Sequence, residues 1–122
     1  MTSHAFPKTL RLLRRGEFRR VYDEGQRRSA SLCTVFLWPN GLPVSRLGIT
    51  TPARLGKAVQ RNRLRRRVRE VFRLNRENVP GGWDILVNPR EAVGKVSFIT
   101  LQRELLRLFP QQPASPSPPG RP

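Results

Sequence analysis

The sequence predicts a small single domain of the α+β class, in which helices pack against a sheet. Three observations lead to this prediction. The chain has 122 residues, which is the usual length of one domain. Segments with the alternation of a β-strand stand between segments in which apolar residues recur at helical spacing. Clusters of proline, glycine and asparagine separate these segments.

The first half of the domain carries one predicted helix and two predicted strands. Residues 17–24 form the helix, and Gly25 is suited to end it. The helically spaced apolar residues are Phe18, Val21 and Tyr22. Residues 32–38 alternate as a strand with one aliphatic face. The other face consists of Thr34, Phe36 and Trp38. After a turn at residues 39–43, residues 47–51 form the next strand.

The second half carries a long helix, a strand and a last helix. The long helix covers residues 58–78, and the Pro-Gly-Gly sequence at residues 80–82 ends it. Residues 83–88 form a strand. Ser97 can cap the last helix, which Pro110 ends. The buried stripe of this helix consists of Phe98, Leu101, Leu105 and Leu108.

Both ends of the chain differ from the middle in composition. We expect residues 1–9 to form a flexible N-terminal arm and residues 10–109 to form the folded domain. Residues 110–122 are rich in proline and serine and have almost no apolar side chain to bury, so we expect a disordered tail there.

The net charge predicts a polyanionic partner. The chain has 24 lysines and arginines against 8 acidic residues, a formal net charge of +16. Such an excess destabilises a compact fold by self-repulsion and indicates binding to nucleic acid or to an anionic membrane. A membrane is the weaker alternative, because no apolar run approaches the roughly 18 residues that span a bilayer. We therefore expect a soluble, cytoplasmic protein that binds no membrane.

The long predicted helix is amphipathic, and one of its faces is rich in arginine. Eight of the residues 61–76 are arginines. At about 100° per residue, the core-facing arc consists of Leu64, Val68, Val71, Phe72 and Asn75. The opposite arc consists of Asn62, Arg63, Arg66, Arg69 and Arg73. A solvated charged face is the alternative, but Glu70 and Glu77 are too few to pair with so many arginines. We therefore favour polyanion binding.

Aromatic residues form a second candidate site. Phe36 and Trp38 lie on the same side of their strand, and Phe18 and Tyr22 lie one turn apart on the first helix. If no helix covers that side of the sheet, these side chains offer a platform on which unpaired bases can stack. The alternative is that all four belong to the core, which is the favoured interpretation for Trp38.

Residues suited to protein catalysis are scarce. The single histidine, His4, lies in the predicted arm, and the carboxylates are scattered. Asp84 stands at the start of a strand, where an aspartate more often satisfies a local turn than serves a function. The single cysteine, Cys33, excludes an internal disulfide and is expected in the core of a protein from a reducing compartment. We therefore expect no catalytic residue and no metal site in the chain itself.

Residues 46–73 combine a strand ending in Leu-Gly-Ile with Gly-Lys-Ala-Val, then Arg-Asn-Arg and a basic helix. Upstream, residues 16–25 read Gly-Glu-Phe-x-x-Val-Tyr-x-x-Gly, and Gly-x-Asp precedes the last strand. Over residues 10–109 this pattern resembles the protein subunit of bacterial ribonuclease P, the ribozyme that trims the 5′ end of precursor tRNA.

The resemblance implies a fold and an activity. The fold is similar to a ribosomal-protein domain, with the order α-β-β-β-α-β-α, a mixed sheet and a left-handed crossover through the arginine-rich helix. General packing rules would predict a right-handed crossover. The holoenzyme is an endoribonuclease whose RNA subunit carries the chemistry and binds the Mg²⁺ ions, while the protein subunit binds the 5′ leader of precursor tRNA in a cleft between the first helix and the sheet.

The resemblance also implies two sets of binding residues. The residues that line the leader cleft would be Phe18, Tyr22, Phe36 and Arg54. Those that meet the RNA subunit would be Lys57, Arg61, Asn62, Arg63, Arg65, Arg66, Arg69 and Arg73.

Two other classes of protein share the basic composition. A ribosomal or other structural RNA-binding protein would have the same charge and fold type. A DNA-binding regulator is less expected, since the sequence has no helix-turn-helix spacing, zinc-finger pattern or leucine heptads.

Overall fold

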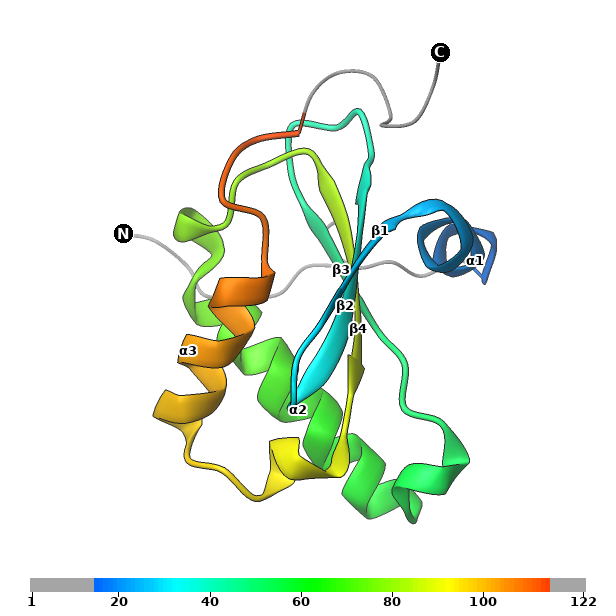
Figure 1. Cartoon of the computed structure of the whole chain (residues 1–122), viewed down its shortest axis with the longest axis vertical. Coiled ribbons are helices and arrows are strands. Elements are labelled where there is room, and N and C mark those ends of the chain that lie inside the picture. Colours follow the sequence, from blue (N-terminus) through cyan, green and yellow to red (C-terminus); the bar gives the residue numbers. More distant parts are fainter. Residues whose placement is uncertain (1–14, 115–122) are drawn as a thin grey trace.

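The computed structural model describes residues 15–114 as three helices and one four-stranded sheet (Figure 1). The main elements are α1 (Arg15–Glu24), β1 (Gln26–Ser29), β2 (Cys33–Pro39), β3 (Arg46–Ile49), α2 (Ala58–Leu74), β4 (Trp83–Pro89) and α3 (Phe98–Leu108). Short 3-10 turns cover Ala53–Leu55, Arg76–Asn78 and Glu91–Gly94. None of the helices in this part of the chain is long and apolar enough to cross a membrane.

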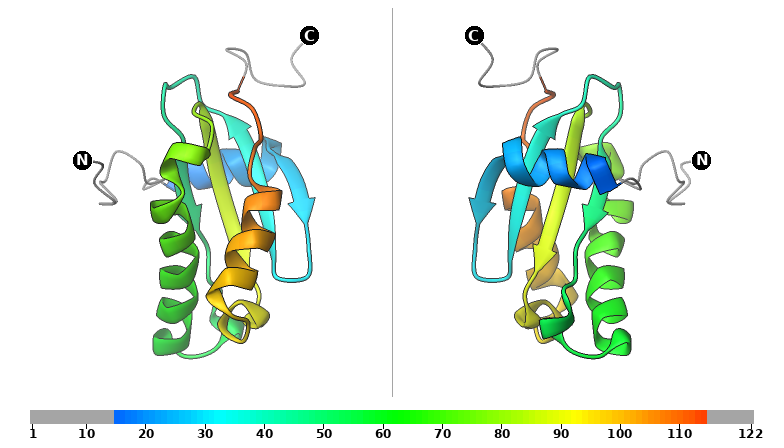
Figure 2. Two further views of the ribbon diagram at one scale, coloured as in Figure 1. Left: turned by 90° about the vertical axis from the view of Figure 1, so that its left-hand side faces the viewer. Right: turned by 90° about the vertical axis from the view of Figure 1, so that its right-hand side faces the viewer.

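The sheet has the strand order β1-β2-β4-β3, in which β3 runs parallel to β4 and the other pairs are antiparallel. Helix α1 covers one face, and α2 and α3 cover the other (Figure 1). In the left view of Figure 2, α2 lies in front of the sheet, β3 and β4 both point down, and β4 lies to the right of β3. The β3–α2–β4 connection is therefore left-handed, and the expected element order and mixed sheet are confirmed.

The sheet separates two cores of unequal size, as the alternation of residues 32–38 predicts. The larger core lies between the sheet and α2 and α3, and β2 contributes Cys33, Val35 and Leu37 to it. The smaller core lies under α1 and consists of Val21, Phe36, Trp38 and Leu86, with Phe18 packed against it. Trp38 is only 7% exposed, so it is a core residue. The buried stripe of α2 is also confirmed for Leu64, Val68, Val71 and Phe72.

Two segments differ from the residue pattern. Strand β1 has the sequence Gln-Arg-Arg-Ser, which has no apolar alternation, and it forms because its backbone pairs with β2 along an edge of the sheet. Helix α2 ends at Leu74, four residues before the predicted end. Asn75 ends it, because its side-chain amide and its backbone N–H both donate to the Val71 carbonyl and a 3-10 turn follows.

The first residues of the predicted tail are hydrogen-bonded to the domain. The indole Nε1 of Trp83 donates to the Gln112 carbonyl at 2.8 Å, and the Ala114 N–H donates to the Gly81 carbonyl. Arg28 donates to the Leu108 carbonyl at 3.2 Å, where a cation complements the negative end of the helix α3 dipole. The remainder of that tail, residues 115–122, and the predicted arm lie outside the described residues.

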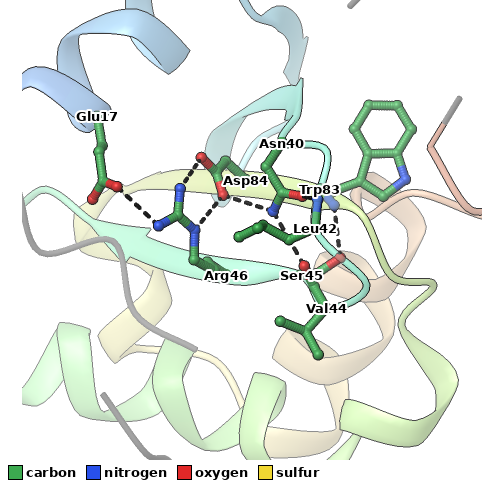
Figure 3. Close-up of polar contacts among 8 residues, drawn as sticks. All are labelled: Glu17, Asn40, Leu42, Val44, Ser45, Arg46, Trp83 and Asp84. Carbon is green, nitrogen blue, oxygen red and sulfur yellow. Dashed lines mark hydrogen bonds and ion pairs between the residues drawn. The ribbon is translucent and has the colours of Figure 1, made fainter. Parts of the chain in front are cut away.

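A partly buried ion-pair network connects α1 to two strands (Figure 3). Arg46 of β3 and Asp84 of β4 are direct partners in the parallel register. The Arg46 guanidinium donates from Nε and NH2 to the two Asp84 carboxylate oxygens, each at 2.8 Å, and from NH1 to Glu17 of α1 at 2.8 Å. Asn40 donates to Asp84 at 2.9 Å. The hydrogen bond with Asp84 raises the pKa of Arg46, so this guanidinium stays charged.

We expect Asp84→Ala to lower the free energy of unfolding by about 3–5 kcal/mol, because it removes the bidentate partner of the largely buried Arg46 guanidinium and leaves only its single hydrogen bond to Glu17. Urea unfolding measures this change. The matched control is Asp23→Ala, which removes an exposed pair with Arg19 at 3.7 Å and should cost less than about 1 kcal/mol. Equal stability of the two variants would contradict a structural role for the Arg46–Asp84 pair.

Candidate nucleic-acid interface

Helix α1 covers only part of its face of the sheet (Figure 2). Side chains on the same face line an open cleft beside α1. The cleft has a volume of about 670 Å³. Its aromatic side chains are Tyr22 and Phe36, and its cations are Arg27, Arg54 and Arg90. The remaining lining residues are Thr34, Thr50, Thr51, Pro52, Asn88 and Pro89. No carboxylate occurs among these described lining residues, so the cleft has a positive potential.

Strand pairing places these side chains together. Phe36 lies between Arg27 of β1 and Leu86 of β4 in the register of the sheet, and Thr34 lies beside Asn88. Residues that are directly opposite in antiparallel strands point to the same face. The face therefore changes along the strands, from apolar side chains and ion pairs under α1 to hydroxyl, amide and guanidinium groups in the cleft.

The two aromatic residues of the cleft form a stacked pair. The ring centroids of Tyr22 and Phe36 are 4.8 Å apart, with an interplanar angle of 33°. Phe36 is 6% exposed, whereas Tyr22 is 56% exposed. Phe36 thus belongs to the small core and supports Tyr22, which presents a free ring surface to solvent. Such a surface can stack on an unpaired base.

Hydrogen bonds organise the polar floor of the cleft. Thr50 donates to the Asn88 side-chain oxygen. Arg90 donates to the Thr34 hydroxyl at 3.3 Å, which is also within 3.3 Å of the Ser29 hydroxyl. These hydrogen bonds connect side chains on or next to β1, β2 and β4. They therefore fix the guanidinium and amide groups of the cleft floor in position before any ligand binds.

The outer face of α2 is the second candidate surface. Its most exposed predicted residues are Lys57, Asn62, Arg63 and Arg66, while Arg61, Arg65, Arg69 and Arg73 are partly buried. Arg66 makes no hydrogen bond or ion pair with any described residue, so its guanidinium is available to a ligand. The predicted arginine face is therefore present, but its members are not equivalent.

Several arginines of α2 are engaged within the protein. Arg65 donates to the Thr51 hydroxyl at 2.5 Å, which links α2 to the rim of the cleft. Arg67 donates to the Val96 carbonyl and so attaches the segment before α3 to α2. Arg73 makes two hydrogen bonds to Glu70, and these raise its pKa. The N-terminal half of α2 therefore carries most of the cationic surface that can bind a ligand.

The structure distributes the predicted leader residues over two environments. Tyr22, Phe36 and Arg54 line the cleft together, whereas Phe18 is half-buried against the small core. Arg27 and Arg90 also line the cleft, although the residue pattern does not predict them there. Period-two alternation could have placed Thr34 and Asn88 on this face, but Arg27 could not be placed without the pairing of β1.

The described residues do not offer a metal site. In residues 15–114, no three histidine, cysteine, aspartate or glutamate side chains come close enough together to hold an ion. Asp84 is engaged with Arg46 and Asn40. The Cys33 thiol is buried, and burial raises its pKa to about 12, so it is neither a ligand nor a nucleophile. This donor set does not fit a protein-bound magnesium ion, which prefers carboxylate oxygens.

Sequence comparisons relate the chain to ribonuclease P proteins. The family model described as Ribonuclease P matches residues 6–112. A Thermotoga ribonuclease P protein component is 38% identical over 111 residues, covering 88% of this chain and 95% of that protein. The ribonuclease P protein component of Desulfosudis oleivorans is 39% identical over 109 residues, covering 89% and 90% of the two chains.

Solved structures agree with the sequence comparisons. The RNase P protein from Thermotoga maritima, in complex with 1-(4-fluorophenyl)-2-thiourea, superposes with a TM-score of 0.75 at 41% identity, covering 81% of this chain and 96% of that chain. The Staphylococcus aureus RNase P protein superposes with a TM-score of 0.73 at 27% identity, covering 83% and 93%. The matches extend over nearly the whole described domain, and they confirm the resemblance carried by the Gly-Lys-Ala-Val and Arg-Asn-Arg motifs: the chain belongs to the ribonuclease P protein component family.

Proposed function

We propose that this chain is the protein subunit of ribonuclease P, that α2 binds the RNA subunit, and that the cleft binds the 5′ leader of precursor tRNA. One observation carries the leader assignment. The cleft joins an exposed aromatic ring to three arginines and contains no carboxylate among its described lining residues. Unpaired nucleotides need both a stacking surface for their bases and cations for their phosphates.

The two surfaces suit two different forms of RNA. The cleft between α1 and the sheet can hold an extended single strand, because stacking on Tyr22 requires a base that is free of its neighbours. The outer face of α2 is convex and offers guanidinium groups without aromatic residues, which suits the phosphate backbone of a folded RNA. The Arg65–Thr51 hydrogen bond connects the two surfaces, so the leader and the RNA subunit would bind to one rigid unit.

The chemistry of cleavage would belong to the RNA subunit. The described residues contain no metal-ligating cluster, and the carboxylates that could act as general bases are dispersed or paired. We propose that Mg²⁺ is bound mainly by the RNA subunit and that the protein contributes binding and orientation. Within this proposal the protein works in the cytoplasm and binds neither a membrane nor DNA. A purely structural role in another RNA assembly has no support from the family comparisons.

We expect the protein alone to leave precursor tRNA intact and to increase its cleavage by the RNA subunit at low magnesium concentration. The physical reason is that phosphate contacts made by the protein replace part of the charge screening that magnesium provides. The measurement is single-turnover cleavage with and without protein. Magnesium-dependent 5′ processing by RNA-free, nuclease-free protein would refute the proposal.

Binding of the RNA subunit should weaken steeply with salt. If α2 and its surroundings neutralise about six to ten phosphates, affinity should fall on the order of 10³ to 10⁵ between about 50 and 200 mM salt. We expect Arg66→Ala to reduce the slope of log affinity against log salt concentration by nearly the contribution of one phosphate contact. The control is Arg107→Ala on α3, whose guanidinium pairs with Glu104 at 3.3 Å. The same slope for Arg66→Ala and the unmodified protein would show that Arg66 contacts no phosphate.

The leader cleft predicts a difference between precursor and mature tRNA. Tyr22→Ala should weaken binding of precursor tRNA to the holoenzyme by about ten-fold, because one base–aromatic stack is worth roughly 1–3 kcal/mol. Mature tRNA has no leader, and its binding should hardly change. Ile99→Ala, which removes an exposed apolar side chain from α3, should affect neither ligand.

Phe36→Ala serves as the comparison for this test. Since Phe36 is buried under α1, its truncation should cost about 3–5 kcal/mol of stability and reduce binding of both ligands. Thermal melts of each variant separate this effect from a direct effect on the leader. Equal losses of precursor and mature tRNA in a fully folded Tyr22→Ala protein would exclude the assignment of the cleft to the leader.

A further inference from the structure

A second cavity lies between the start of α2 and the 3-10 turn that follows β4. Its volume is about 330 Å³, and it shares no lining residue with the leader cleft. Leu55 and Leu64, both buried, provide its apolar lining. Its polar lining consists of Gln60, Arg63, Glu91 and Lys95. The cavity adjoins the part of α2 that carries the exposed cations.

The polar groups of this cavity are largely unused within the protein. Glu91 and Lys95 are exposed, and neither side chain makes a hydrogen bond or ion pair with the described residues. Among the described residues, Arg63 donates only to the Gly94 carbonyl, at 3.4 Å. Gln60 accepts from the Lys57 N–H through its side-chain oxygen, and its two amide hydrogens have no acceptor within residues 15–114. The cavity thus combines a free carboxylate, two cations and a free amide donor around an apolar wall.

Gly94 contributes to the open shape of this cavity. A Cβ atom at position 94 would lie 3.3 Å from Cδ2 of Leu64, so a larger residue would press against the apolar wall. A flat apolar group that enters the cavity can therefore contact the wall that Leu55 and Leu64 form.

The geometry points to a binding site for an unpaired guanine of the bound RNA. A carboxylate is an acceptor only, so a base that it recognises must present N–H donors. Guanine presents two adjacent donors, N1–H and the N2 amino group, which one carboxylate can accept together. Adenine, cytosine and uracil each present one donor group on that edge. Arg63 and Lys95 would bind the flanking phosphates, and Leu55 and Leu64 would contact the base.

This assignment deepens the proposed function, because it gives the RNA that docks on α2 a base-specific contact in addition to phosphate contacts. The carboxylate has a definite role in that contact. Arg63 and Lys95 alone would attract any nucleotide, whereas Glu91 repels phosphate and favours the base edge with the most donors. The site therefore selects guanine by attracting nucleotides through its cations and repelling phosphate through Glu91.

The test titrates the full-length protein with guanosine 5′-monophosphate and, separately, with adenosine 5′-monophosphate. Amide NMR chemical shifts of the protein report the binding of each nucleotide. We expect guanosine monophosphate to shift the signals of Gln60, Glu91 and Lys95 and to bind about ten-fold tighter than adenosine monophosphate. Equal affinities would mean that the cavity only attracts phosphate and would overturn the assignment. Shifts confined to the outer face of α2 or to the leader cleft would also overturn it.

Glu91→Gln is the informative variant, because it keeps the size of the side chain, removes its negative charge and replaces one acceptor oxygen by an amide donor. We expect it to abolish most of the preference for guanosine monophosphate while the melting temperature stays unchanged. Glu77→Gln, an exposed carboxamide substitution near the other end of α2, is the matched control and should keep the preference. A guanine preference that survives in Glu91→Gln would show that the carboxylate does not read the base.

Measurements on the holoenzyme distinguish the guanine contact from the proposed function. If both are correct, Glu91→Gln should reduce affinity for the ribonuclease P RNA several-fold and leave the ratio of precursor to mature tRNA binding unchanged. Failure of the unmodified protein to assist the RNA subunit would refute the proposed function alone, since the nucleotide titration does not depend on it. Equal RNA affinity of Glu91→Gln and Glu77→Gln holoenzymes would refute the guanine contact within the complex.

Discussion

The Arg46–Asp84 pair is the interaction on which the rest of the structure depends. It joins the two parallel strands at one register position and, through Glu17, attaches α1 to the same point. Because β3 and β4 are parallel, the segments that follow them leave the sheet at the same edge. Those segments supply Thr50, Arg54 and Arg90 to the cleft, and the first one continues into α2.

The arginine content has structural and binding consequences. Part of the +16 charge is used inside the protein, where Arg28 and Arg67 donate to backbone carbonyls and Arg46 to carboxylates. These guanidinium groups satisfy polar atoms at helix ends and between elements, which lysine would do less well because it lacks a planar fork of donors. The cations that remain at the cleft and on α2 repel one another, and a bound polyanion would relieve that repulsion.

The aromatic pair of the cleft shows how core and binding surface share one contact. Phe36 belongs to the small core under α1, and its ring supports Tyr22, which is mostly exposed. A stacking surface held by a buried neighbour loses little conformational entropy when a base binds. The same arrangement makes Phe36 part of the packed core and leaves Tyr22 on the surface.

Local periodicity was sufficient for the buried stripe of α2, the alternation of β2 and the α+β class, because these features depend on neighbours within one element. The motifs around the Arg-Asn-Arg sequence identified the family. The tertiary structure alone decided that β1 is a strand, that Arg27 and Arg90 line the cleft and that Glu91 lies beside Arg63 and Lys95 without an ion pair to any described residue, whereas the core position of Trp38 was already the favoured interpretation of the sequence. These features depend on strand order and register, which bring together residues far apart in the chain, and no local pattern encodes such neighbours.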